Sequence, residues 1–168
     1  MSENNFELQV GMCDIFVEGN AEFPVQGEAA EFLAEPIYED IDLYEISNYD
    51  KLLVGWNVTF KIVLEDYSKK ALELGMPMLE PTDFGHGDAK LMSRARDKAK
   101  EIRIHPRDRA DTDREHDIVI YKAFPVNSFE KKFGKEKSTW EIQFVALAKD
   151  ADPKAVNNYF SIGQSLLG

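Results

Sequence analysis

The sequence has 168 residues, of which 43% are apolar and 30% are charged, and its formal net charge is −11. This composition is typical of a folded globular protein and excludes a disordered chain, and the length fits one domain with a substantial core. No stretch approaches the roughly 20 apolar residues that a membrane-spanning helix requires, so we expect no membrane partner.

Six strands are predicted from the alternation of apolar and polar residues, which is the period of a half-buried strand. In chain order they span Val10–Val17, Ile37–Ile46, Leu52–Leu64, about Glu101–His105, Asp117–Phe124 and Ser138–Ala148. The turn-forming residues Ser47–Asp50 predict that the second and third strands form a hairpin. We expect Trp56, Val58, Phe60 and Ile62 to pack in the core with Trp140, Ile142 and Phe144.

Helical signals are few. Asp66–Gly75 contains good helix formers and ends at a glycine, with Pro77 just beyond it, which predicts one short helix. Asp88–Lys100 is compatible with a helix but has too few apolar residues to bury a stripe. Met76–Gly87 is predicted to be an exposed loop, and Lys154–Tyr159 is compatible with a helix. The sequence therefore predicts a mainly β single domain with one or two helices.

Charge is unevenly distributed along the chain. The first fifty residues contain thirteen Asp or Glu and no Lys or Arg, whereas nine of the twenty basic residues lie between Lys90 and Arg114. Surfaces of opposite sign favour association between copies, although a simpler interpretation is that the charge only keeps the protein soluble. The acidic half is unsuited to gripping nucleic acid, and the basic segment has interleaved carboxylates and no aromatic residue on which bases could stack.

No catalytic, cofactor-binding or metal-binding motif is found in the sequence. Asp83, His86 and Asp88 form one loose group and His105, Asp108, His116 and Asp117 form another, but neither has the ligand spacing of a known metal site. There is no nucleophile motif and no glycine-rich phosphate loop. The single Cys13 cannot form an internal disulfide, which suits a reducing cytoplasm. We expect neither an enzyme nor a cofactor.

Several runs in the middle and the last part of the chain point to a family. They are His105-Pro106, Asp117–Pro125, Trp140–Asp150 and Tyr159–Gly163, together with the long alternating strand and following helix of Tyr49–Tyr67. Their order resembles the tail tube (major tail) proteins of long-tailed bacteriophages. The resemblance covers about Ile37 to Gly163. Some members carry an added immunoglobulin-like C-terminal domain, which we do not expect in residues 1–168.

The resemblance implies a structural protein with a β-sandwich or barrel fold, flanking helices, and long hairpins and loops for inter-subunit pairing. Six copies close into a ring, hairpins from each copy line a β-barrel lumen, and rings stack into a tube through which double-stranded DNA passes without specific binding. The implied partners are other copies and other tail proteins (initiator, tape measure and terminator). The implied location is the virion tail, after synthesis in the cytoplasm of the bacterial host.

The resemblance also implies roles for individual residues. Polar side chains of the hairpin face the lumen: Asp40, Asp42, Asn57, Thr59 and Lys61, of which Lys61 partly offsets the acidic lining. The loop of about residues 76–114 and a C-terminal arm of about residues 155–168 bridge subunits. The arginines expected there are Arg94, Arg96, Arg103, Arg107 and Arg109. The alternative is a monomeric or dimeric β-domain that acts as a head–tail adaptor or an acidic DNA mimic.

Overall fold

The computed structural model describes residues 11–18, 21–24, 29–65, 67–83 and 85–163. The strands in these ranges are β1 (Cys13–Val17), β2 (Ala21–Pro24), β3 (Glu31–Leu43), β4 (Ile46–Leu64), β5 (Leu79–Thr82), β6 (Gly85–Asp88), β7 (Lys100–Pro106), β8 (Ile118–Pro125), β9 (Trp140–Ala146) and β10 (Phe160–Ile162). The helices are α1 (Lys69–Gly75) and α2 (Ala95–Lys98). The prediction of a mainly β fold with few helices is confirmed. No described helix has the length and apolar character needed to cross a membrane.

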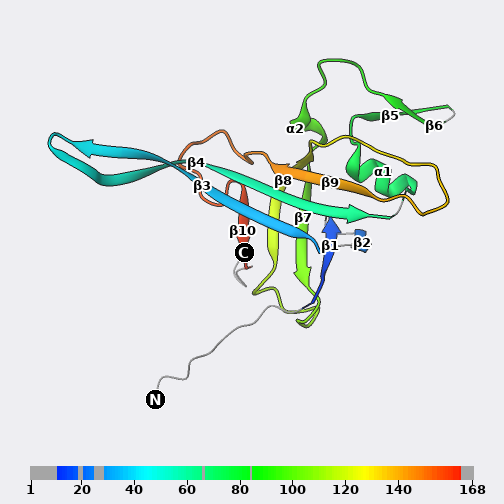
Figure 1. Cartoon of the computed structure of the whole chain (residues 1–168), viewed down its shortest axis with the longest axis horizontal. Coiled ribbons are helices and arrows are strands. Elements are labelled where there is room, and N and C mark those ends of the chain that lie inside the picture. The colour runs from blue at the N-terminus through cyan, green and yellow to red at the C-terminus, as the bar shows by residue number, and fades with distance from the viewer. Residues whose placement is uncertain (1–10, 19–20, 25–28, 66, 84, 164–168) are drawn as a thin grey trace.

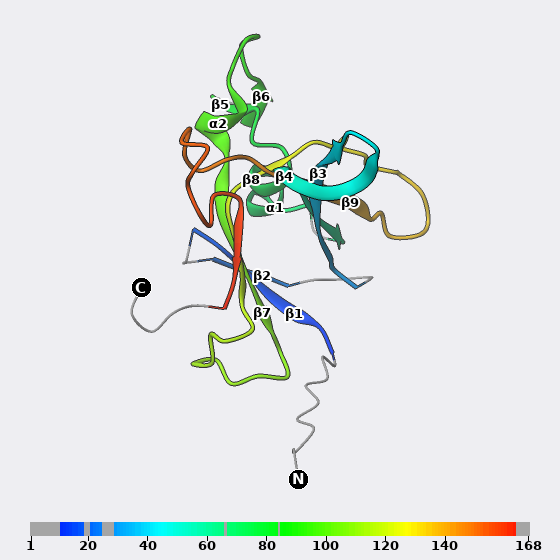
Figure 2. The same cartoon turned by 90° about the vertical axis from the view of Figure 1, so that its left-hand side faces the viewer.

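One curled antiparallel sheet forms the body of the molecule (Figures 1 and 2). Its strands follow the order β2-β1-β7-β8-β9-β4-β3, and β10 pairs with β8 beside this path. Residues 123–125 of β8 pair with β9, whereas residues 118–120 pair with β10 on the same edge of β8. β5 and β6 form a separate two-stranded hairpin that extends beyond the sheet (Figure 1).

The core is built from the inner half of β4 and the strands around it. β4 contributes four side chains that are at most 2% exposed: Val58, Phe60, Ile62 and Leu64. Trp140, Ile142 and Phe144 of β9 belong to one buried cluster with Phe60 and Ile62, as predicted, whereas Val58 is buried outside that cluster. Trp56, which was also expected in the core, is half-buried. The prediction that the whole of Leu52–Leu64 is half-buried on one face is wrong, because Leu52 and Val54 are each 53% exposed.

The helix predicted over Asp66–Gly75 is present from Lys69 onwards, and Asp66 lies outside the described residues. The Ser68 side chain caps it by accepting a hydrogen bond from the backbone N–H of Ala71, at 3.4 Å. The helix ends at Gly75, where a Cβ would lie 2.1 Å from the Trp140 ring. Glycine therefore allows α1 to pack directly against β9.

The hairpin turn is displaced from its predicted position at Ser47–Asp50. The strands of the hairpin instead turn at Tyr44-Glu45, where Leu43 pairs with Ile46 and Glu45 has a φ of 68°. Asp42 Oδ1 accepts a hydrogen bond from the backbone N–H of Asn48, at 2.7 Å, and Asn48 has a φ of 54°. These turn-forming residues therefore form an irregularity within β4, and β4 is six residues longer at its start than the predicted strand.

Three other segments differ from the predicted pattern. Met76–Gly87, expected to be loop, contains β5 and the first residues of β6. Within Asp88–Lys100 the helix is confined to the four residues of α2. Lys154–Tyr159 forms turns and bends rather than a helix, and β10 follows it. Val10, the first residue of the predicted first strand, lies outside the described residues.

Candidate assembly surface

A two-stranded ribbon projects from the sheet. β3 pairs with residues 46–61 of β4, but the last pair between β4 and β9 towards the hairpin turn is Thr59 with Val145. Residues 36–57, which we call the ribbon, therefore extend beyond every other described strand of the sheet (Figure 1). Both outer edges of the ribbon carry backbone N–H and C=O groups that no other described strand pairs.

The surface of the ribbon is apolar as well as exposed. Ten of its large apolar or aromatic side chains are between 36% and 93% exposed: Ile37, Tyr38, Ile41, Leu43, Tyr44, Ile46, Tyr49, Leu52, Leu53 and Val54. Tyr44 at the turn is the most exposed of these, at 93%. Exposed large apolar side chains concentrated on one projecting element indicate an interaction site.

Carboxylates are interleaved with these apolar side chains. The ribbon contains Glu39, Asp40, Asp42, Glu45 and Asp50 and a single basic residue, Lys51. Lys51 forms an ion pair with Asp40, which lies opposite it in the register, and this carboxylate raises the pKa of the Lys51 ammonium. Asp42 holds the backbone of Asn48, as described above. Two of the predicted lumen residues thus also have a local structural role.

The other predicted lumen residues lie nearer the body. Asn57 Nδ2 donates to Glu35 at 3.3 Å, Thr59 pairs with Val145, and Lys61 forms a 3.3 Å ion pair with Glu141. Pro36 pairs with Trp56, so the even-numbered residues of β3, including Asp40 and Asp42, continue the row of Trp56. Asn57, Thr59 and Lys61 lie in the other row. The register therefore does not bring the five residues together on one face.

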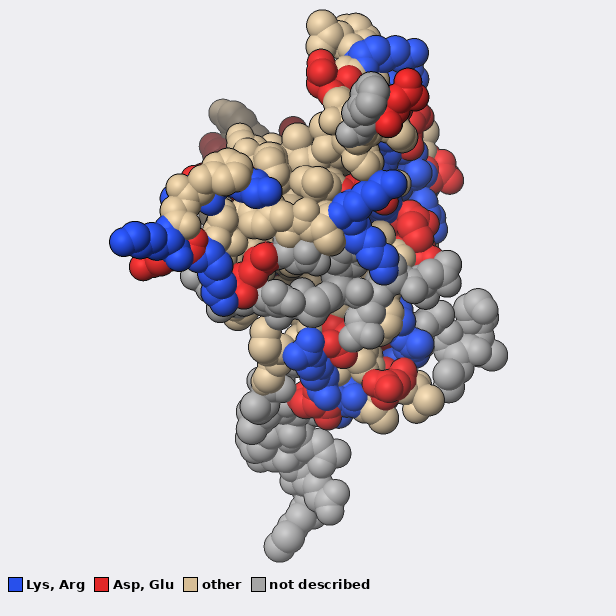
Figure 3. All heavy atoms as spheres, turned by 90° about the vertical axis from the view of Figure 1, so that its right-hand side faces the viewer, with Lys and Arg blue, Asp and Glu red and all other residues tan. Residues whose placement is uncertain are grey.

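Three of the five predicted inter-subunit arginines have partners within the chain. Arg96 donates to the carbonyl groups of Ala148 and Lys149, and Arg107 forms an ion pair with Asp14. Arg103 binds Asp117 at 2.8 Å. No ion pair is found for Arg94 or Arg109 among the described residues. Basic and acidic side chains are interspersed on the end of the molecule opposite the ribbon (Figure 3).

A buried ionic cluster surrounds Asp117, whose side chain is 1% exposed. Its Oδ1 lies 2.6 Å from His105 Nδ1, and its Oδ2 lies 2.8 Å from Arg103 and 3.2 Å from Arg114. Burial lowers the pKa of His105, but the hydrogen bond and charge of Asp117 outweigh it, with help from the backbone of Arg109, and the pKa is raised overall. Of the predicted group that contained His105, Asp108, His116 and Asp117, the structure thus brings His105 and Asp117 together in this cluster.

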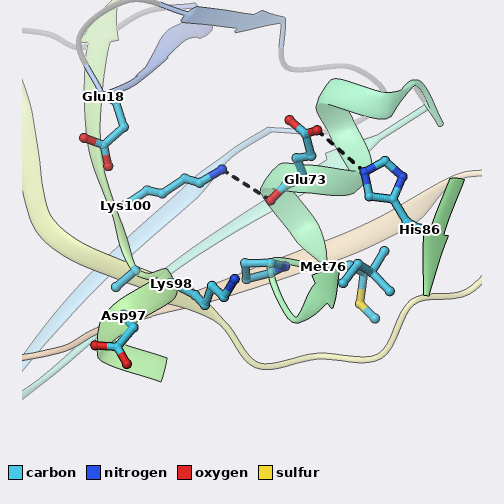
Figure 4. A pocket seen from close by; sticks show the side chains of 10 residues that line it. Glu18, Glu73, Met76, His86, Asp97, Lys98 and Lys100 are labelled. Atoms are coloured by element: carbon cyan, nitrogen blue, oxygen red, sulfur yellow. Dashed lines mark hydrogen bonds and ion pairs between the residues drawn. The ribbon is translucent and has the colours of Figure 1, made fainter. Parts of the chain in front are cut away.

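The second predicted group does not assemble. His86 lies 3.7 Å from Glu73 and lines a pocket of about 370 Å³ together with Lys98 and Lys100, without Asp83 or Asp88. Figure 4 shows Lys100 and His86 approaching Glu73 from two sides, and Lys100 Nζ donates to the Glu73 carbonyl at 3.4 Å. The described part of the chain contains no cluster of three or more His, Cys, Asp or Glu that could hold a metal ion.

Sequence reasoning missed a groove at the root of the ribbon. Its volume is about 560 Å³, and it lies between residues 53–56 of β4 and residues 153–162 near the C-terminus. Val156 and Ile162 on its C-terminal wall are 83% and 64% exposed. The apolar residues of the C-terminal segment were the available signal, but nothing in their spacing indicated a partner in β4.

Comparison with known proteins gives structural matches at low identity. No family model and no curated protein matches the sequence. A chain of the extended sheath–tube complex of PVC, an extracellular contractile injection system, superposes with a TM-score of 0.54 at 11% identity, covering 84% of this chain and 88% of that one. The anti-feeding prophage cap, which terminates the AFP tube, superposes with a TM-score of 0.53 at 14% identity, covering 98% and 100%. The protein shares its fold with these two chains.

Proposed function

We propose that this protein is a structural, non-enzymatic subunit of a phage-tail-like tube, and that copies associate through their ribbons. The observation that carries the proposal is a ribbon with exposed apolar side chains and two outer edges that no other described strand pairs. The fold shared with chains from an injection-system sheath–tube complex and a tube cap supports it. In this proposal residues 1–168 form a single tail-tube-like domain, made in the cytoplasm of a bacterial host and placed in the virion tail.

The physical argument concerns the state of the ribbon in an isolated subunit. An unpaired strand edge is a template for another strand, and a two-stranded ribbon is marginally stable in water without further support. Burying its apolar side chains contributes about 25 cal/mol for each Å² removed from water. Ribbon-to-ribbon pairing therefore satisfies the backbone groups and covers the apolar surface in a single step.

Pairing between the ribbons of several copies could close a ring around a central channel. We propose that six copies form a ring and that stacked rings carry DNA through a lumen lined by the ribbon face that carries Asp40 and Asp42. Asn57, Thr59 and Lys61, also predicted for the lumen, lie in the other row of β4. Residues 31–57 contain seven carboxylates and one lysine, so a lumen lined by them repels phosphates and lets DNA slide.

The lumen assignment is tested with the double variant Asp40→Asn/Asp42→Asn. Asparagine keeps the oxygen that accepts the hydrogen bond from Asn48 while it removes both charges. We expect tubes to form and DNA ejection to slow, measured in virions assembled with the variant. Ejection at the wild-type rate would contradict an electrostatic role for these two residues.

Contacts outside the lumen complete the proposal. We assign inter-subunit and inter-ring contacts to the loop of residues 76–114 and to the arm of residues 155–168, except for β7 and β10, which pair within the subunit's own sheet. Arg94 and Arg109 are the arginines best placed to bind a neighbour. Arg96, Arg103 and Arg107 act first within the chain, because their partners are internal. Initiator, tape-measure and terminator proteins are the other expected partners.

A second candidate function is a cap that ends a tube. The cap superposes on nearly the whole of this chain, and its own chain is fully covered. A tube subunit binds copies of itself both within a ring and above and below it, whereas a cap stops growth after one layer. Isolated rings that never lengthen would favour the cap, and tubes of many lengths would favour the tube subunit.

The adaptor and DNA-mimic alternatives fit the ribbon less well. A DNA mimic presents a continuous set of solvated carboxylates to a nucleic-acid-binding protein. Here the carboxylates alternate with exposed aliphatic and aromatic side chains such as Ile41, Leu43 and Tyr44. This mixture favours a surface that becomes covered by another polypeptide.

Negative-stain electron microscopy of the purified protein over a range of concentrations tests the proposal. We expect rings or hollow tubes for the wild type, and only single subunits for Leu52→Asp, which places a charge on the apolar ribbon. Val126→Asp is the matched control, because Val126 is 56% exposed but lies outside the ribbon, the loop of residues 76–114 and the arm of residues 155–168. Assembly of Leu52→Asp at the wild-type concentration would exclude the ribbon as the assembly surface.

A further inference from the structure

A three-residue strand near the C-terminus contacts both the sheet and the root of the ribbon. β10 pairs with residues 118–120 of β8. From this position the Phe160 ring meets the edge of Trp56 in β4, with ring centroids 5.2 Å apart. It also meets Phe32 in β3 at 5.7 Å. One side chain of β10 therefore contacts both strands that form the ribbon.

The place where Phe160 makes contact is where support for the ribbon ends. β9 pairs with β4 as far as Thr59, and the register between β3 and β4 shifts between Ile37 and Tyr38. Such a β-bulge bends a strand and increases its local twist. Trp56 lies between Thr59, the last residue of β4 that pairs with β9, and this bulge. Pairing between strands therefore does not by itself fix the direction that the ribbon takes beyond the bulge.

The other end of β10 is anchored to the body. The backbone N–H of Gly163 donates to the carbonyl of Asp117 at 2.8 Å. Gly163 has a φ of 78°, and a Cβ there would lie 2.9 Å from the carbonyl oxygen of Glu115, so only glycine fits without strain. The Asp117 side chain is itself held by His105 and Arg103, so the anchor point belongs to the buried ionic cluster.

We propose that β10 and Gly163 form a latch that sets the direction of the ribbon, with Phe160 and Gly163 as positioning residues. Phe160 holds the ribbon root through Trp56 and Phe32, and Gly163 fixes the latch to the body. The consequence for assembly rests on the proposed function. Ribbons of neighbouring copies can pair along their length when each ribbon leaves its own subunit in the same direction. A loosened latch therefore reduces the fraction of subunits that assemble without unfolding the subunit.

The experiment measures the direction of the ribbon in single subunits by pulsed electron–electron spin resonance. The labelled protein carries Cys13→Ser to remove the native thiol. Tyr44→Cys places one label at the exposed turn of the ribbon, and Glu101→Cys places the other on the exposed side of β7. We expect one narrow distance distribution in this background. Phe160→Ala and Gly163→Ala should each give a distribution about twofold wider, because few other buried contacts restrain the ribbon.

Three controls separate positioning from general damage. Ser161→Ala alters β10 without touching either positioning residue and should leave the distribution unchanged. Phe160→Tyr keeps the ring and should restore the narrow distribution, while Phe160→Leu keeps apolar volume for the case in which the alanine variant does not fold. The double variant Phe160→Ala/Gly163→Ala should match the single variants, since both break one latch.

Folded Phe160→Ala, Phe160→Leu and Gly163→Ala subunits with the narrow wild-type distribution would overturn the proposal. Broadening in Ser161→Ala equal to that in Phe160→Ala would also overturn it. The measurement uses unassembled subunits, so its outcome does not depend on tube formation. If the latch variants broaden the distance distribution but the wild type forms no tubes, the result would count against the proposed function and not against the latch.

Discussion

The inner and outer halves of β4 have the same sequence pattern and opposite environments. Apolar residues alternate without interruption from Leu52 to Leu64. In the inner half, Phe60 and Ile62 are at most 1% exposed, whereas in the outer half Leu52 and Val54 are each 53% exposed. The inner half has β9 along its edge and the curled sheet over its face. The outer half has β3 as its single strand neighbour among the described strands.

The difference shows what period-two alternation does and does not predict. Alternation predicts that one face of a strand is covered, but it contains no information on whether the cover comes from the same chain. For the inner half the cover is internal. For the outer half we infer that it comes from another copy, and substitutions in the two halves should therefore affect different measurements.

The largest expected effect comes from the inner half. Phe60→Ala should lower the free energy of unfolding by about 3–5 kcal/mol, because it removes a buried ring and leaves a cavity. Leu52→Ala should change it by less than about 0.5 kcal/mol, the usual range for surface sites. Urea denaturation at concentrations where the protein is monomeric measures both. Equal losses would show that the outer half is buried within the subunit.

Charges should divide in the same way. Asp117→Asn in the body should lower the free energy of unfolding by about 3 kcal/mol. This value is at the lower end of the range for removing one partner of a buried ion pair, because Arg114 is partly exposed. The same denaturation experiment measures this loss. Asp14→Asn is a control, since Asp14 pairs with the more exposed Arg107. A smaller loss for Asp117→Asn than for Asp14→Asn would contradict the central position of the Asp117 cluster.

A smaller, pH-dependent effect is expected from His105. Its pKa in the folded protein is raised above the ordinary value of 6.5, because Asp117 favours the protonated ring more than burial disfavours it. Its stabilising contribution is therefore complete below the unfolded-state pKa and is lost as the pH rises through the folded-state pKa. Unfolding midpoints across this range should fall more steeply for the wild type than for His105→Gln. Parallel curves would show that His105 does not titrate in this way.

The smallest effect on stability is expected from the ion pair of the ribbon. Lys51→Ala removes the partner of Asp40, but both side chains are more than half exposed, so the unfolding midpoint should not change measurably. The ribbon becomes more acidic, and assembly should then need more salt to screen the repulsion between copies. Turbidity or sedimentation across a sodium chloride series tests this. If assembly of Lys51→Ala depends on salt as assembly of the wild type does, the Asp40 charge has no role in assembly.

The strongly patterned parts of the fold could be predicted from the sequence. β4, β7, β8 and β9 bury enough alternating residues for the pattern to be clear, and Ser68 and Gly75 place α1 within a few residues. β10 has three residues, which is too short for periodicity to be recognised. β5 includes Pro81 and β6 includes two glycines, all of which usually indicate loops.

The position of the hairpin turn could not be predicted because a side chain decides it. Ser47, Asn48 and Tyr49 have the composition of a turn, but Asp42 captures the N–H of Asn48 and leaves these residues within β4. Among the candidate site residues, alternation predicts that Asp40 and Asp42 lie on one side of β3. Which residues of β4 lie on the same face of the hairpin as Asp40 and Asp42 depends on the pairing of Pro36 with Trp56. The sequence does not specify that register.

The two open edges of the ribbon differ from each other, since one belongs to β3 and the other to β4. A contact that joins the β3 edge of one copy to the β4 edge of the next is heterologous, and it leaves an edge of each kind free at the ends of the growing series. A dimer formed in this way is as reactive as a monomer. In the proposed assembly, association stops only when the angle between successive copies returns the last edge to the first. We therefore infer that the angle at the ribbon root would set the number of subunits in a closed ring.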